Sequence, residues 1–210
     1  MKYLGKPAGM WALFAGSFEK HLTVEFDLTA GQAKDVAARA TKKYREIIAK
    51  LPEFDKRDRF EMNIVNCAML AAFILCMPQR PDIKTLTDYY AAAMMTPTMK
   101  AFCRASGKKK FTPKDIEGMK ATAKLRAGDR NPYSWNMDFF EYEDGSGYEA
   151  RFTTCGICTL MQALGLYDLT PALCHLDYTM SDAGGASDFV REYTLASGGP
   201  YCDCGYHKKQ

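Results

Sequence analysis

Residues able to do chemistry concentrate in the last third of the chain. Five of the eight cysteines lie there, with two aspartates and an arginine: Cys155, Cys158, Cys174, Cys202, Cys204, Asp177, Asp203 and Arg191. Thiols can act as nucleophiles or bind metals, carboxylates can transfer protons, and a guanidinium can hold an anion through paired hydrogen bonds. The segment therefore predicts a nucleophile site, a metal site or a redox pair.

Cys155 and Cys158 belong to a Cys-Gly-Ile-Cys motif that follows a predicted strand and begins a predicted helix. The N-terminus of a helix stabilises a thiolate, so Cys155 could be ionised near neutral pH. A thioredoxin-type redox pair is one interpretation, although the preceding elements form a hairpin and not a βαβ unit. The alternative is that Cys158 packs in the core.

Cys174 and Asp177 are three residues apart in a second predicted helix, so they should share one face of it. A thiol beside a carboxylate is an unusual core pair, because burying the carboxylate is costly without partners. This favours a catalytic role for both residues. The alternative is a core cysteine next to a solvated aspartate.

A predicted strand near the end of the chain carries Cys202, Asp203 and Cys204. Alternation places the two cysteines on one face and Asp203 on the other, so Cys202 and Asp203 should not line one pocket from a regular strand. Arg191 lies on the predicted strand before it. It is the best candidate to hold a substrate carboxylate, and the alternative is a cross-strand salt bridge.

The cysteine spacing leaves a metal centre open but does not specify one. The chain has C-x2-C once and C-x-C once, so the second knuckle of a zinc ribbon is absent. An iron–sulfur cluster needs four thiolates and tolerates irregular gaps. No cofactor is firmly predicted; zinc or an iron–sulfur cluster could share Cys155, Cys174 and Cys202 as ligands.

Hydrophobic periodicity predicts an α+β fold, in which a helical N-terminal layer packs on a small antiparallel sheet with two short helices. Residues 1–133 should form the helical layer, which would not fold independently, and residues 134–210 the part that carries the site, within one domain overall. The predicted helices are 33–51, 58–77, 82–103 with an interruption at 96–97, 113–128, 155–164 and 170–181, and the predicted strands are 135–139, 148–153, 188–195 and 201–206.

Composition limits the partners and the compartment. The net charge of +3 comes without a broad basic face, which argues against nucleic acid. The longest apolar run, Cys67 to Met77, is too short to cross a membrane. The first residues resemble a signal peptide only loosely, so we expect a cytoplasmic protein with reduced thiols. A homo-oligomer is possible.

The C-terminal motifs resemble the L-2-amino-thiazoline-4-carboxylic acid hydrolase family. The matching elements are Phe152-Thr153-Thr154-Cys155, Leu164-Gly165-Leu166, Cys174-His175-Leu176-Asp177-Tyr178, Arg191 and Thr194 before Ser197-Gly198, and Cys202-Asp203. They cover roughly the last sixty residues. Cys158 and Cys204 depart from the pattern, because the family has other residues there, an aromatic one in the second case.

The resemblance implies a hydrolase that opens a small heterocyclic amidine, L-2-amino-thiazoline-4-carboxylate, to N-carbamoyl-cysteine. Cys174 or Cys155 would be the nucleophile and Asp177 the general acid and base, with Cys202 a further catalytic residue. Arg191 would anchor the carboxylate of this small-molecule substrate, and Thr194 and Asp203 would help to bind it. Two other classes stay open: a cysteine-rich metal- or cluster-binding module with a sensing or redox role, and a partner-binding scaffold without catalysis.

Overall fold

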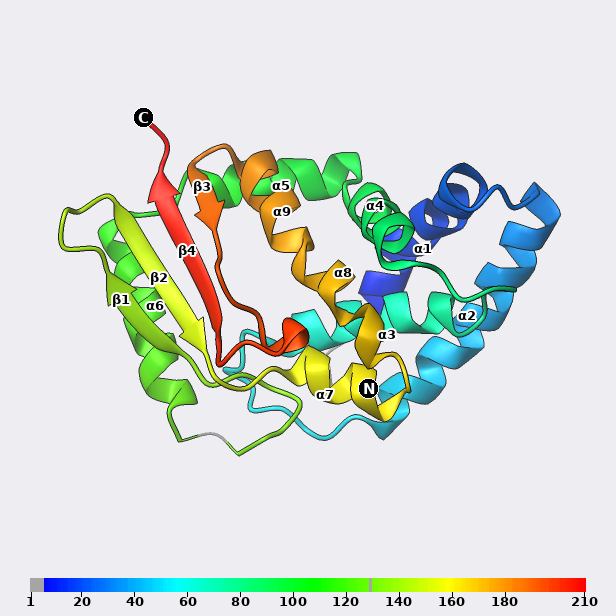
Figure 1. Cartoon of the computed structure of the whole chain (residues 1–210), viewed down its shortest axis with the longest axis horizontal. Coiled ribbons are helices and arrows are strands. Elements are labelled where there is room, and N and C mark those ends of the chain that lie inside the picture. Colours follow the sequence, from blue (N-terminus) through cyan, green and yellow to red (C-terminus); the bar gives the residue numbers. More distant parts are fainter. Residues whose placement is uncertain (1–5, 129) are drawn as a thin grey trace.

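The computed structural model describes residues 6–128 and 130–210 and confirms the predicted α+β class. A layer of helices packs against a small antiparallel sheet. Figure 1 shows the sheet at one end of the molecule and helices α1 and α2 at the other. The first half of the chain supplies α1 (Lys6–Glu25), α2 (Ala30–Lys50), α3 (Glu61–Ile74), α4 (Ile83–Met94), α5 (Pro97–Gly107) and α6 (Pro113–Arg126).

Local sequence signals set most of these helix boundaries. The Thr112 hydroxyl accepts a hydrogen bond from the backbone N–H of Asp115, and Pro113 takes the first position of α6, as predicted. Thr96 and Pro97 start α5 in the same way and separate it from α4. Helix α1 was not predicted. It buries Phe14, Phe18 and Leu22 in the helical layer.

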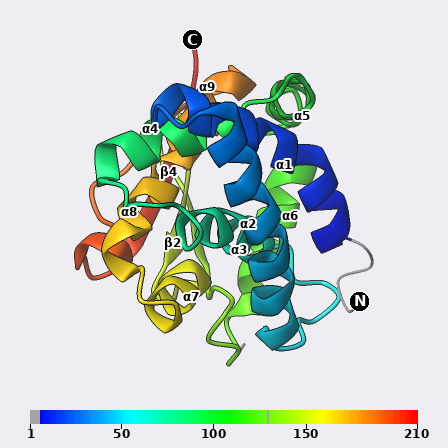
Figure 2. The same ribbon diagram turned by 90° about the vertical axis from the view of Figure 1, so that its right-hand side faces the viewer.

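Helix α3 lies near the middle of the helical layer (Figure 2). It is apolar almost all round, and every residue from Cys67 to Ile74 is buried, as expected for a helix with neighbours on all sides. No helix in the described ranges is both long and apolar enough to cross a membrane.

The sheet contains β1 (Asp138–Glu141), β2 (Gly147–Phe152), β3 (Ser187–Val190) and β4 (Cys202–Lys208) in the order β1-β2-β4-β3, all antiparallel. Two predicted strands are longer than the real ones. The first begins at Asp138, which leaves Trp135 in the preceding loop. The third ends at Val190, so Arg191 follows the strand and is not part of it.

Alternation along β4 separates its side chains as predicted. Cys202 and Cys204 are buried, and Cys204 lies opposite Ala150 of β2 in the cluster between the sheet and α6. Asp203 lies opposite Arg151 on the other face. Cys202 and Asp203 therefore do not line one pocket.

Three short helices connect the strands: α7 (Gly156–Ala163), α8 (Thr170–Cys174) and α9 (Leu176–Gly184). The prediction of one helix over 170–181 was wrong, because the chain is interrupted at His175 and forms two. Cys174 ends α8 and Asp177 lies in the first turn of α9, so they do not share the face of one continuous helix. Helix α9 packs on α5 where two glycines meet; a Cβ on Gly107 would lie 2.3 Å from the carbonyl oxygen of Gly184.

A buried ion pair joins the helical layer to the loop before the sheet. The Arg126 guanidinium lies 3.2 Å from the Asp58 carboxylate, and both side chains are 1% exposed. Arg126 Nε also donates to the Trp135 carbonyl at 2.8 Å, and the Ser134 hydroxyl donates to Asp58 at 2.5 Å. The pair thus holds the segment that carries Trp135 against the start of α3 and the end of α6.

Replacing Asp58 with Asn should lower the free energy of unfolding by about 3 kcal/mol, because it leaves a buried arginine without its counter-charge. Urea unfolding followed by circular dichroism measures the change. Asp55→Asn is the matched control, since Asp55 forms an exposed ion pair with Arg57 and its loss should change little. Equal effects of the two substitutions would show that the buried pair has no special role.

Candidate active site

The N-terminus of α7 brings the two cysteines of the Cys-Gly-Ile-Cys motif together. Cys155 is the N-cap residue and Cys158 is the third residue of the helix. Residues three positions apart lie on the same side of a helix, so the two thiols are neighbours. Both cysteines are half-buried, whereas Cys67, Cys76, Cys103, Cys202 and Cys204 are buried.

Four donor groups lie around the Cys155 sulfur and stabilise its ionised form. The Cys158 thiol contributes most, followed by the backbone N–H groups of Cys158 and Ile157 and by the Trp135 indole. Together they hold the pKa of the Cys155 thiol below its ordinary value of 9.0, although burial opposes them. The same bond and burial raise the pKa of Cys158. The arrangement favours a thiolate at Cys155 and a thiol at Cys158.

Gly156 allows this geometry. A Cβ at this position would lie 2.1 Å from the carbonyl oxygen of Tyr133 and 2.9 Å from Ile64 of α3. Only glycine lets the start of α7 come this close to the loop before the sheet. Because that loop carries Trp135, the contact helps to bring the indole to Cys155.

Two further thiols lie near this helix N-terminus. Charge on Cys155 raises the pKa of both Cys174 and Cys202, although burial has the larger effect on each. We call Cys155, Cys158, Cys174 and Cys202 the thiol cluster. Of these four, Cys155 alone has a lowered pKa. The sequence left Cys155 and Cys174 as alternative candidates for the nucleophile. The directions of their pKa shifts favour Cys155 over Cys174.

Tyr167 completes the surroundings of the thiol cluster and was missed in the sequence. Its hydroxyl donates to the Leu195 carbonyl at 3.0 Å and also lies within hydrogen-bonding reach of Cys158. It belongs to the 3-10 helix Tyr167–Leu169, where no motif distinguishes it. Trp135 was also missed, because it is far from Cys155 in the sequence.

Arg191 joins the elements around the thiol cluster. Its guanidinium donates to the Cys174 carbonyl at 2.9 Å, to the Asp177 carboxylate at 2.5 Å and to the Cys204 sulfur at 2.9 Å. Its side chain is only 6% exposed, and the Nε–H is buried without a partner. Most of its donors are thus taken by protein groups, so its role as the anchor of a substrate carboxylate stays a prediction.

Asp203 and Thr194 also make contacts within the protein. The Asp203 carboxylate accepts the backbone N–H groups of Glu192 and Tyr193 at 2.7 and 2.6 Å. The Thr194 hydroxyl caps the 3-10 helix Leu195–Ser197. These contacts shape the loop between β3 and β4, and that loop places the Leu195 N–H 3.2 Å from the Cys202 sulfur. Substrate binding by Asp203 and Thr194 stays a prediction.

The thiol cluster does not form a metal centre. In the part of the chain that the structure describes, no group of three or more His, Cys, Asp or Glu side chains could hold a metal ion. A zinc or iron–sulfur site that shares Cys155, Cys174 and Cys202 is therefore not supported. Within the thiol cluster, the pKa of Cys155 is lowered, whereas the pKa values of the other three thiols are raised.

Asp177 also lines a pocket of about 270 Å³ between α5, α6, α9 and the sheet. Arg59 and Lys110 supply positive charge there. The Lys110 ammonium lies 3.3 Å from the centroid of the Tyr206 ring, and burial lowers its pKa to about 8, although Asp115 partly opposes this. Asp177 thus contacts Arg191 on one side and this pocket on the other.

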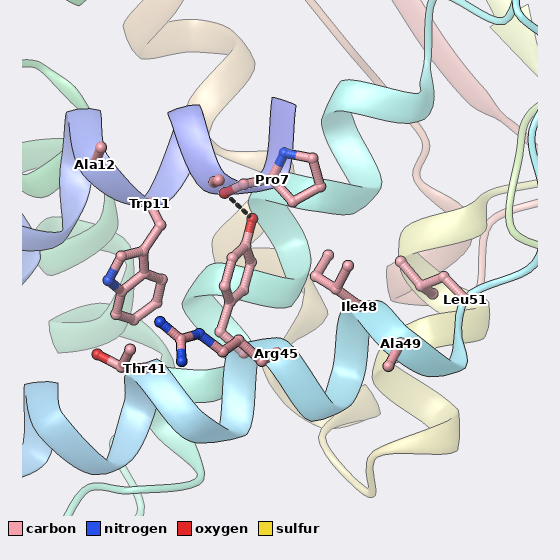
Figure 3. A pocket seen from close by; sticks show the side chains of 10 residues that line it. Pro7, Trp11, Ala12, Thr41, Arg45, Ile48, Ala49 and Leu51 are labelled. Carbon is pink, nitrogen blue, oxygen red and sulfur yellow. Dashed lines mark hydrogen bonds between the residues drawn. The ribbon is translucent and has the colours of Figure 1, made fainter. Parts of the chain in front are cut away.

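A larger apolar groove of about 450 Å³ lies between α1 and α2, away from the thiols (Figure 3). Trp11, Ile48 and Leu51 line it, and the Tyr44 hydroxyl in its wall donates to the Pro7 carbonyl at 2.8 Å. Its lining contains neither thiol nor carboxylate. We therefore place the candidate active site at the thiol cluster and not in this groove.

Residues 62–206 match the family model described as L-2-amino-thiazoline-4-carboxylic acid hydrolase. The matched segment is more than half of the chain, so the chain belongs to this family. The family is one of hydrolases. The match begins in α3 and so extends well beyond the C-terminal motifs that suggested it. No curated protein and no solved structure matches the chain.

Iodoacetamide should alkylate Cys155 about tenfold or more faster than Cys174 at neutral pH, because only a thiolate attacks. Mass spectrometry of the digested protein identifies the modified residue. As pH rises, the rate at Cys155 should reach its midpoint below 9.0, since its pKa is lowered. A fast reaction that maps to Cys174, or that persists in Cys155→Ser, would contradict this ranking.

The stability of the protein should rise with pH above about 8 through Lys110. Its pKa is about 8 when folded and near 10.5 when unfolded, so the unfolded chain binds more protons between these values. Urea unfolding at several pH values, with Lys110→Met as the reference, isolates this contribution. Lys109→Met, at an exposed neighbour, is the control and should leave the pH dependence unchanged.

Proposed function

We propose that the protein is a cysteine-dependent hydrolase that opens 2-amino-thiazoline-4-carboxylate or a closely related cyclic isothiourea. The proposal combines the family with the place of Cys155 at the N-terminus of α7, where the donor groups around its sulfur hold the pKa of the thiol below its ordinary value. A thiolate stabilised in a folded site at neutral pH is the requirement for nucleophilic catalysis by cysteine.

The proposed reaction has two stages. In the first, the Cys155 thiolate attacks the ring carbon between nitrogen and sulfur. The carbon–sulfur bond of the ring breaks, the ring sulfur leaves as a thiol after taking a proton, and an isothiourea on Cys155 remains. In the second, water attacks the same carbon and the Cys155 thiolate leaves. The product is N-carbamoyl-cysteine, and one water is consumed.

Asp177 is the best candidate to move the protons in these steps. Its side chain is 43% exposed although Arg191 pairs with it, so one side of the carboxylate is open to a ligand or to water. Arg191 fixes the orientation of that carboxylate and, through the Cys174 carbonyl, the end of α8. We therefore assign Arg191 to positioning Asp177, and the buried Nε–H is among the donors that its contacts within the protein leave for a substrate.

Cys174 and Cys202 are supporting residues in this proposal. Burial raises the pKa of both thiols, which disfavours either as the attacking group at neutral pH. The charge on Cys155 raises both pKa values further, so neither thiol competes with Cys155 as a thiolate.

Incubation with 2-amino-thiazoline-4-carboxylate tests the proposal, with N-carbamoyl-cysteine quantified by mass spectrometry. Cys155→Ser should lower kcat by about a thousandfold or more, and Asp177→Asn by about a hundredfold. Cys76→Ser replaces a buried thiol outside the site and should retain the wild-type rate.

Two results would change the proposal in different ways. Turnover that survives in Cys155→Ser but is lost in a folded Cys174→Ser would make Cys174 the nucleophile. A wild-type protein that does not open the ring, yet alkylates rapidly at Cys155, would refute the substrate and keep the thiol chemistry.

A further inference from the structure

In the proposed hydrolysis Cys158 only supports Cys155 as a hydrogen-bond donor, and its position suggests a second task. We propose that Cys155 and Cys158 form a reversible disulfide by exchange with a small-molecule disulfide. The oxidised pair would switch off the hydrolase, and this second claim depends on the proposed function. The first claim, disulfide formation, does not.

Geometry carries the proposal. Cys155 is the N-cap residue of α7 and Cys158 is its third residue, so the two thiols lie three positions apart at the helix N-terminus, and each shifts the pKa of the other. Their separation along the chain suits the short distance between Cα atoms that a disulfide requires. Both residues keep part of their surface exposed at the start of α7, where a small reagent can approach them.

The difference between the two thiols suits them to successive roles in exchange. The Cys155 thiolate attacks one sulfur of the external disulfide, forms a mixed disulfide and releases one thiolate. Cys158 then loses its proton and attacks the Cys155 sulfur, which releases the second external thiolate. Two protein thiols become one disulfide, and the external disulfide becomes two thiols after taking up the two protons.

Hydrogen bonds to the Cys155 thiolate affect the equilibrium as well as the rate. Donors from Trp135 and from the α7 backbone stabilise the reduced, ionised form and are weakened when the sulfur enters a disulfide. The bridge should therefore be readily reduced by an excess of dithiol, as expected for a regulatory disulfide.

The test is incubation of the reduced protein with glutathione disulfide, followed by blocking of free thiols in denaturant and mass spectrometry. Wild type and Cys76→Ser should take up two alkyl groups fewer than the reduced protein, carry no glutathione, and yield a Cys155–Cys158 peptide. Dithiothreitol should reverse the change. Cys158→Ser cannot resolve the intermediate and should accumulate glutathione on Cys155.

Stable glutathione on Cys155 in the wild type would overturn the proposal, and so would a bridge from Cys155 to Cys174 or Cys202. Absence of any reaction would overturn it as well. These readouts need no hydrolase substrate. If the bridge forms and the reduced protein opens no thiazoline ring, the redox pair stands and the proposed function fails.

Discussion

The buried ion pair between Asp58 and Arg126 is the constraint on which the site depends. Two charges in the interior are stable only together, so their pairing fixes the start of α3, the end of α6 and the Trp135 carbonyl in one place. Trp135 in turn donates to Cys155. A thiol at the end of a short helix thus owes part of its ionisation to an electrostatic contact made elsewhere in the core.

Arg191 plays the corresponding part on the other side of the thiol cluster. It binds groups from α8, α9 and β4 and leaves few of its donors free. The spacing of Cys174, Asp177 and Arg191 therefore has a structural explanation in addition to the proposed catalytic one. The Arg191 guanidinium contacts both of the other residues. Replacing any one of the three would therefore disturb the others, even if only one of them touched a substrate.

Sequence reasoning succeeded where the signal was local. The Thr112-Pro113 start of α6 and the place of Cys155 at a helix N-terminus both depend on neighbours in the chain. It failed where contacts between residues far apart in the sequence determine the structure. Nothing near Trp135 indicates that its indole reaches Cys155, and nothing near Lys110 indicates that its ammonium group packs on Tyr206. The interruption of the predicted helix at His175 was also missed, because the spacing of hydrophobic residues does not reveal so short an interruption.

Alternation along β4 has a consequence for how the site could change. Asp203, on the outer face, holds the loop whose Leu195 N–H contacts Cys202 on the inner face. The two faces of one strand are therefore coupled through the backbone of a neighbouring loop. A binding partner or a mutation at the outer face could therefore change the hydrogen bond to the buried Cys202 sulfur without contacting that sulfur.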